Sequence, residues 1–84
     1  MAILSGIPPR MLKEVFERNG YKLVGDDEYQ WMLARDGDVP LLIPKLGAVV
    51  SVPVMDAAMD HARRRGLLRA LMAAVAEHVS RDPD

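Results

Sequence analysis

The spacing of hydrophobic residues changes twice along this chain, and the resulting order constrains the fold more than any other feature. From Pro8 to Arg18 the apolar residues recur at helical spacing. Three short segments between residues 21 and 43 then carry alternating or β-rich apolar residues, with polar turns between them. Helical spacing returns after Ser51. The order predicts an α+β fold, in which a three-stranded antiparallel sheet carries two helices on one face.

The first helix has a clear beginning and end in the sequence. Pro8 and Pro9 suit its first turn, where a missing N–H group costs nothing. Asn19-Gly20 predicts its end, because glycine readily takes the left-handed conformation found there. Its predicted buried stripe is Met11, Leu12, Val15 and Phe16.

The three predicted strands are residues 21–24, 29–35 and 39–43. In the second strand Tyr29, Trp31 and Leu33 alternate with polar or smaller residues, so they share one face. The turn after it contains Asp36-Gly37, which is typical of a hairpin. The third strand has Pro40 and Pro44 near its ends, which predicts a short strand or a strand at the edge of the sheet.

A second helix is predicted after Ser51, which can serve as its N-cap. Its buried stripe is Met55, Ala58, Met59 and Ala62. The β-branched run at residues 49–52 leaves an alternative open, in which this run is a fourth strand and the helix starts nearer Asp56. Gly66 is a natural stop, although the sequence leaves open whether it ends the helix or only interrupts it.

Residues 67–80 form a further apolar helix, appended to a core of residues 7–66 within a single domain of residues 1–84. Its stripe at helical spacing is Leu68, Leu71, Met72, Val75 and Val79. Two helices already cover the one sheet face, so we expect little room for a third in the core. An exposed apolar stripe is typical of an interface. We therefore expect a homo-oligomer or a protein partner to use this helix.

The run LKEVFERNGYKLV, the Asp36-Gly37 turn, the strand 41–44 and the closing Gly66-Leu67 occur in an order that resembles the HicA-like toxin family. The best local match is residues 14–24, and the likeness spans about residues 7–67. The resemblance implies the α-β-β-β-α fold of double-stranded-RNA-binding domains. It also implies a toxin–antitoxin setting.

In that family the second strand begins with glycine, serine and a histidine that is needed to cleave mRNA. Here Tyr29 and Gln30 occupy this region, which therefore lacks the side chain best suited to carry a proton near neutral pH. The leading hypothesis is a non-catalytic HicA-like domain that acts as a small RNA-binding or protein-interaction module. One alternative is an active mRNA interferase with an atypical active site based on Tyr29. Another is a dimeric interaction module unrelated to RNA.

Binding to RNA would have to rest on few groups. The chain has a net charge of −1, whereas RNA-binding domains usually carry a basic excess. The one basic cluster is Arg63, Arg64, Arg65 and Arg69, and a solvated helix face explains it more simply. Tyr29 can stack on an unpaired base, although packing on the sheet is its simpler interpretation. We therefore expect RNA binding to be weak.

Other chemistry finds little support in the sequence. The chain has no cysteine, and His61 and His78 do not have metal-ligand spacing. Asp26, Asp27 and Glu28 are consecutive acids, for which a solvated turn is the simplest explanation. We expect no metal and no cofactor. The sequence shows no secretory signal and no stretch long enough to cross a membrane, so a cytoplasmic protein is expected.

Overall fold

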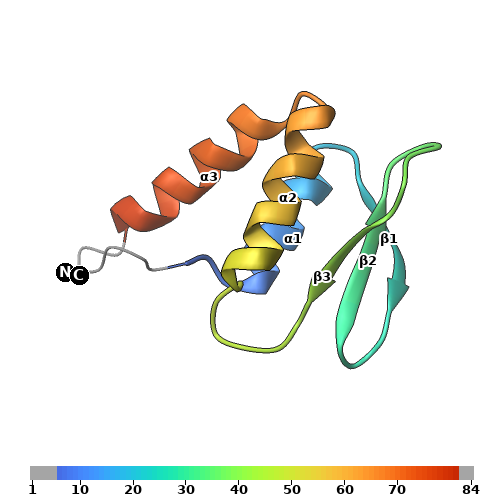
Figure 1. The fold of residues 1–84 in the computed structure, drawn as a ribbon, viewed down its shortest axis with the longest axis horizontal. Helices are drawn as coiled ribbons and strands as arrows, with labels where there is room; N and C mark the ends of the chain where they lie inside the picture. Colours follow the sequence, from blue (N-terminus) through green and yellow to red (C-terminus); the bar gives the residue numbers. More distant parts are fainter. Residues whose placement is uncertain (1–5, 82–84) are drawn as a thin grey trace.

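The computed structural model describes residues 6–81 and contains the α+β fold predicted from the sequence (Figure 1). The chain forms three antiparallel strands in the order β1-β2-β3, with helices before and after them. The elements are α1 (Pro9–Arg18), β1 (Lys22–Asp26), β2 (Gln30–Ala34), β3 (Leu41–Pro44), α2 (Val52–Arg64) and α3 (Leu68–Arg81).

One face of the sheet packs against α1 and α2. Leu33 pairs with Leu23 on β1 and with Leu41 on β3, so these three side chains share that face. Leu33 and Leu41 are buried, whereas Leu23 is partly exposed because the helices contact β2 and β3 rather than the β1 edge. A β-bulge between Leu23 and Gly25 breaks the regular ladder of that edge.

Glycine ends both α1 and α2 in the same way. Gly20 and Gly66 have φ angles of 93° and 73°, in the left-handed region where a side chain would be strained. After α2, the N–H of Leu67 donates to the carbonyl of Ala62 at 2.7 Å, and that of Gly66 donates to Arg63 at 3.3 Å. These are the two bonds of a Schellman motif. Gly66 therefore ends α2 and separates it from α3.

Residues 49–52 do not form a fourth strand, so that alternative is wrong. Among residues 6–81, the only backbone pairing of this segment with a distant residue is one hydrogen bond from Val50 N–H to the carbonyl of Ile7, at 2.8 Å. Ser51 stands at the N-cap of α2 as predicted, but its side chain makes no capping hydrogen bond. The β-branched residues here instead extend the loop that joins β3 to α2.

The expectation that the core has no room for a third helix is also wrong. Helix α3 folds back against α1 and α2, in a layer beyond the helices that cover the sheet (Figure 1). Leu71 is fully buried there, and Leu67, Ala74 and Val75 pack against the same core. The sheet is one packing surface of this fold, and the outer sides of α1 and α2 provide another, which α3 covers.

The core thus extends over three layers. Its buried side chains include Ile7, Leu12, Val15, Phe16, Tyr21, Leu33, Leu41, Ile43, Ala58, Ala62 and Leu71. The predicted stripes of α1 and α2 supply most of the helical members. None of the helices in the described part of the chain is long and apolar enough to cross a membrane.

Candidate functional site

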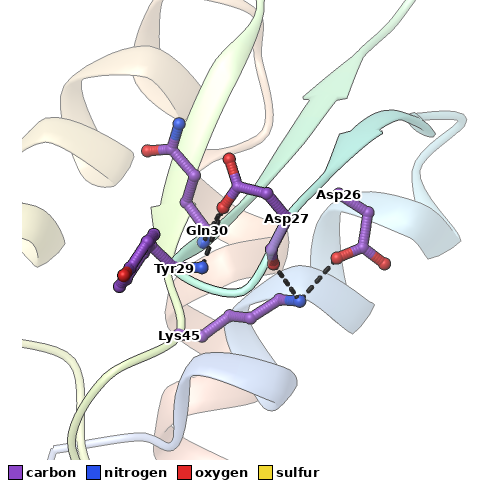
Figure 2. A network of polar contacts seen from close by, with 5 residues as sticks. All are labelled: Asp26, Asp27, Tyr29, Gln30 and Lys45. Carbon is purple, nitrogen blue, oxygen red and sulfur yellow. Dashed lines mark hydrogen bonds and ion pairs between the residues drawn. The ribbon is translucent and has the colours of Figure 1, made fainter.

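Tyr29 and Gln30 lie at the β1–β2 turn, where the backbone is held by Asp27 (Figure 2). The Oδ1 atom of Asp27 accepts hydrogen bonds from the N–H groups of Tyr29 at 2.8 Å and Gln30 at 3.0 Å. Tyr29 is 61% exposed, and its ring points away from the charged groups of the turn. The simpler expectation, that Tyr29 packs on the sheet, is therefore wrong.

Asp26 and Asp27, two of the three acids of the turn, have structural partners. The Nζ atom of Lys45 donates to the carboxylate of Asp26 and to the carbonyl oxygen of Asp27 (Figure 2). Lys45 N–H also donates to the carbonyl of Tyr29 at 2.8 Å, which joins the turn to the end of β3. Within residues 6–81 no group of three histidine, cysteine or acidic side chains could hold a metal ion.

His61 is hydrogen-bonded to a tyrosine, but this tyrosine is Tyr21 and not Tyr29. The Nε2 atom of His61 lies 2.8 Å from the hydroxyl of Tyr21, a buried residue just before β1. Burial lowers the pKa of His61, and the nearby Arg65 guanidinium lowers it further. Burial raises the pKa of Tyr21, against the smaller opposing effect of Arg35. Neutral forms of both side chains are therefore favoured, with Tyr21 hydrogen-bonded to a neutral imidazole.

Arginine side chains surround this pair. Arg35 lies over the Tyr21 ring, with its Cζ atom 5.3 Å from the ring centroid. Oδ2 of Asp38 is 3.5 Å from Nε of Arg35 and 3.2 Å from Nε of Arg65. We call this region the arginine end. It comprises Tyr21, Arg35, Asp38, Asp60, His61, Arg63, Arg64, Arg65 and Arg69.

The residues expected to bind RNA do not come together. The β1–β2 turn with Tyr29 and the α2–α3 junction with Arg63 to Arg69 lie at opposite ends of the molecule (Figure 1). Arg63 and Arg64 are ion-paired with Asp60 at 3.8 and 3.2 Å. Arg69 is exposed on α3. A single RNA strand stacked on Tyr29 would thus leave the arginines out of reach of its neighbouring phosphates.

Around Tyr29 the surface is apolar instead. Large apolar side chains of the β3–α2 loop and of the first turn of α2 are exposed at the same end of the molecule as this turn (Figure 1), with exposed fractions of 70% for Leu46, 47% for Val49 and 72% for Val52. We call Tyr29, Leu46, Val49 and Val52 the apolar end. The turn and the loop together carry three acids, Asp26, Asp27 and Glu28, and one lysine, Lys45.

A groove of about 590 Å³ opens next to the apolar end, between α1, the end of β3 and the second half of α3. Trp31 lines it, together with Met11, Lys45 and Ala74. The ammonium groups of Lys13 and Lys45 lie 5.4 and 5.3 Å from the centre of the Trp31 ring. The volume lies within the range of ligand sites. Alternation along β2 placed Trp31 on the covered face, but nothing in the sequence showed that α3 would form a wall of this groove.

The predicted interface residues of α3 divide between the core and the surface. Leu71 is fully buried within the chain, so its assignment to an oligomer interface is wrong. Leu68 and Val75 are half-buried. Met72 and Val79 are exposed. Self-association through α3 stays a prediction that now rests on these two side chains.

Comparison of the chain with family models, with curated proteins and with solved structures finds no match.

Proposed function

We propose that this protein is a non-catalytic HicA-like domain that binds another protein through its apolar end. The observation that carries the proposal is the exposure of Tyr29, Leu46, Val49 and Val52 at one end of the molecule. Single exposed apolar residues are ordinary, but several at one site are typical of an interface. The groove lined by Trp31 continues from this surface and offers a place for a side chain of the partner.

The geometry also supports a non-catalytic role. Tyr29 occupies the position that the resemblance assigns to the catalytic histidine, and its ring points into solvent. His61 is hydrogen-bonded to Tyr21 at the opposite end. A general base must lie within hydrogen-bonding distance of the proton that it removes. Tyr29 and His61 therefore cannot act on the same ribose.

The charges of the apolar end indicate the chemistry of the partner. Three acids and one lysine leave two negative charges in excess beside the exposed apolar side chains. Complementary charge steers association and selects partners. We therefore propose that the partner is a protein segment with apolar side chains next to lysine or arginine.

The binding test uses a defined peptide in which leucine alternates with lysine. The peptide is titrated into the protein, and binding is measured from the amide chemical shifts of the protein. We expect the peptide to shift the resonances of Tyr29, Leu46, Val49 and Val52, and a leucine–glutamate peptide to leave them unchanged. Val52→Ser should weaken binding. Val39→Ser is the matched control, because Val39 is 68% exposed but lies at the β2–β3 hairpin. Equal binding of both peptides, or an equal loss in both variants, would contradict the proposed surface.

Two further measurements separate the rival functions. Incubation with mRNA should leave the RNA intact, whereas cleavage that Tyr29→Phe abolishes would establish the enzyme instead. Light scattering after size exclusion measures the oligomeric state, and a dimer that Val52→Ser leaves intact would agree with the self-association predicted for α3. A dimer that Val52→Ser dissociates would make a second copy, and not another protein, the occupant of the apolar end.

A further inference from the structure

The arginine end contains a small pocket that the proposed function does not use. It lies between α2 and the segment leading into β3, and has a volume of about 270 Å³. Val39, Leu41 and Ala57 form its apolar wall, and Asp60, His61, Arg64 and Arg65 line its polar side. The pocket therefore combines a small apolar surface with two guanidinium groups, an imidazole and one carboxylate, and that carboxylate is ion-paired with Arg64.

Positive charge is in excess around this pocket. Asp38 is shared by Arg35 and Arg65, whose Nε atoms both approach the same carboxylate oxygen. Asp60 is shared in turn by Arg63 and Arg64. Four guanidinium groups thus share two carboxylates, which leaves two positive charges of the cluster uncompensated. A ligand with two negative charges would balance the group.

Two donors at the pocket also lack a hydrogen-bond acceptor within residues 6–81. Nε of Arg65 is buried and makes no hydrogen bond, although it lies 3.2 Å from Asp38 as an ion pair. When the Tyr21 hydroxyl donates to Nε2 of His61, the proton of the neutral imidazole is on Nδ1, for which the structure shows no partner. Of these two donors only Nε of Arg65 is buried, and a buried polar group without a hydrogen-bond partner is uncommon and calls for an explanation.

We infer that this pocket binds a phosphate monoester whose organic part is small and apolar. The dianion matches the excess of two positive charges, and its oxygens accept hydrogen bonds from guanidinium groups, for which arginine is well suited. The ester group would pack against Val39, Leu41 and Ala57. This site is separate from the apolar end and does not depend on the function proposed for it.

Phenyl phosphate is the probe, titrated at constant ionic strength and followed by calorimetry and amide chemical shifts. We expect saturable binding that shifts the resonances of His61 and Arg64. Arg64→Gln should weaken it about tenfold or more, because charge-assisted hydrogen bonds are lost. Arg63→Gln is the matched control: it removes one positive charge from the same cluster but no group that lines the pocket, so it should weaken binding less than Arg64→Gln. Both arginines pair with Asp60, and their side chains are 66% and 72% exposed, but only Arg64 lines the pocket.

Three other ligands define the chemistry. Dimethyl phosphate and benzoate carry one charge and should bind more weakly than phenyl phosphate. A short phosphoserine peptide tests whether the phosphate belongs to a protein side chain. Tighter binding of the peptide than of phenyl phosphate would assign the phosphate to a protein, and weaker binding would assign it to a small molecule.

The inference is overturned if the binding of phenyl phosphate does not saturate, if the monoanions bind equally well, or if Arg63→Gln weakens binding as much as Arg64→Gln. Unchanged thermal unfolding of both variants would show that they fold.

Discussion

The two ends of this molecule differ in how far the chain itself packs around their tyrosine side chains. At the arginine end, Tyr21 and His61 are hydrogen-bonded to each other, and Arg63, Arg64 and Arg65 reach an aspartate. At the apolar end, Tyr29, Leu46 and Val52 are more than half exposed. Two tyrosines of one small fold therefore have opposite roles. Tyr21 contributes to stability, and Tyr29 is available for binding.

The strongest test of this comparison truncates each tyrosine in turn. Tyr21→Ala removes a buried ring that packs edge-on against Phe16, with ring centroids 5.1 Å apart. We expect it to lower the free energy of unfolding by about 3–5 kcal/mol. Tyr29→Ala should change it by no more than about 0.5 kcal/mol, because the side chain is exposed. Urea denaturation measures both, and similar losses would show that the two ends do not differ in this way.

A second test concerns α3, whose two sides differ in the same manner. Leu71→Ala should lower the free energy of unfolding by about 2–5 kcal/mol, because it leaves a cavity between α3 and the layer of α1 and α2. Met72→Ala, one residue further on, removes a partly exposed side chain and should cost less than about 1 kcal/mol. Equal effects of the two substitutions would mean that α3 is not docked as described.

The local features of the fold could be read from the sequence. Each predicted strand lies within about two residues of its observed position, because alternation and turn residues are local signals. Gly20 ended α1 as predicted. The position of α3 was missed, since a stripe of apolar residues shows that a helix is buried but not against which surface. Leu71 therefore looked like an interface residue, although it belongs to the core.

The polar cluster at the arginine end was missed for a related reason. Tyr21 and His61 are 40 residues apart, and only the packing of α2 beside the start of β1 brings them together. One signal was present, because His61 lies three residues after Ala58, on a face that helical spacing predicted to be buried. A histidine on that face requires a hydrogen-bond partner, but the sequence alone does not identify it.

Removing only the hydroxyl group of Tyr21 gives a smaller effect than truncation. Tyr21→Phe keeps the ring against Phe16 but leaves Nε2 of His61 without its partner at 2.8 Å. We expect a loss of about 1 kcal/mol in the free energy of unfolding, the usual value for one such hydrogen bond. Tyr29→Phe should have no measurable effect, because its side chain is 61% exposed and its hydroxyl makes no hydrogen bond within residues 6–81. A loss in Tyr29→Phe but not in Tyr21→Phe would reverse the roles of the two tyrosines.

The smallest expected effect is on the pH dependence of stability, because His61 is only partly buried. Its pKa is lowered in the folded protein by burial and by Arg65, with Arg35 acting in the same direction and Asp38 and Asp60 in the opposite one. In the unfolded chain the pKa of histidine is about 6.5. Between these two pKa values the unfolded chain binds a proton that the folded protein does not. The free energy of unfolding contributed by His61 is therefore complete above pH 6.5, falls as the pH drops below it, and levels off below the folded pKa.

Urea denaturation between pH 8 and pH 4.5, repeated on His61→Gln, isolates this contribution. Carboxylates also titrate in the lower part of the range, so the quantity of interest is the difference between the two proteins. We expect this difference to shrink on acidification, because His61→Gln cannot bind the proton. A difference that grows as the pH falls would mean that protonated His61 stabilises the fold, with Asp38 and Asp60 prevailing over burial and the two arginines. In that case the arginine end would be a site that acid strengthens, and its contrast in stability with the exposed surface around Tyr29 would widen as the pH falls.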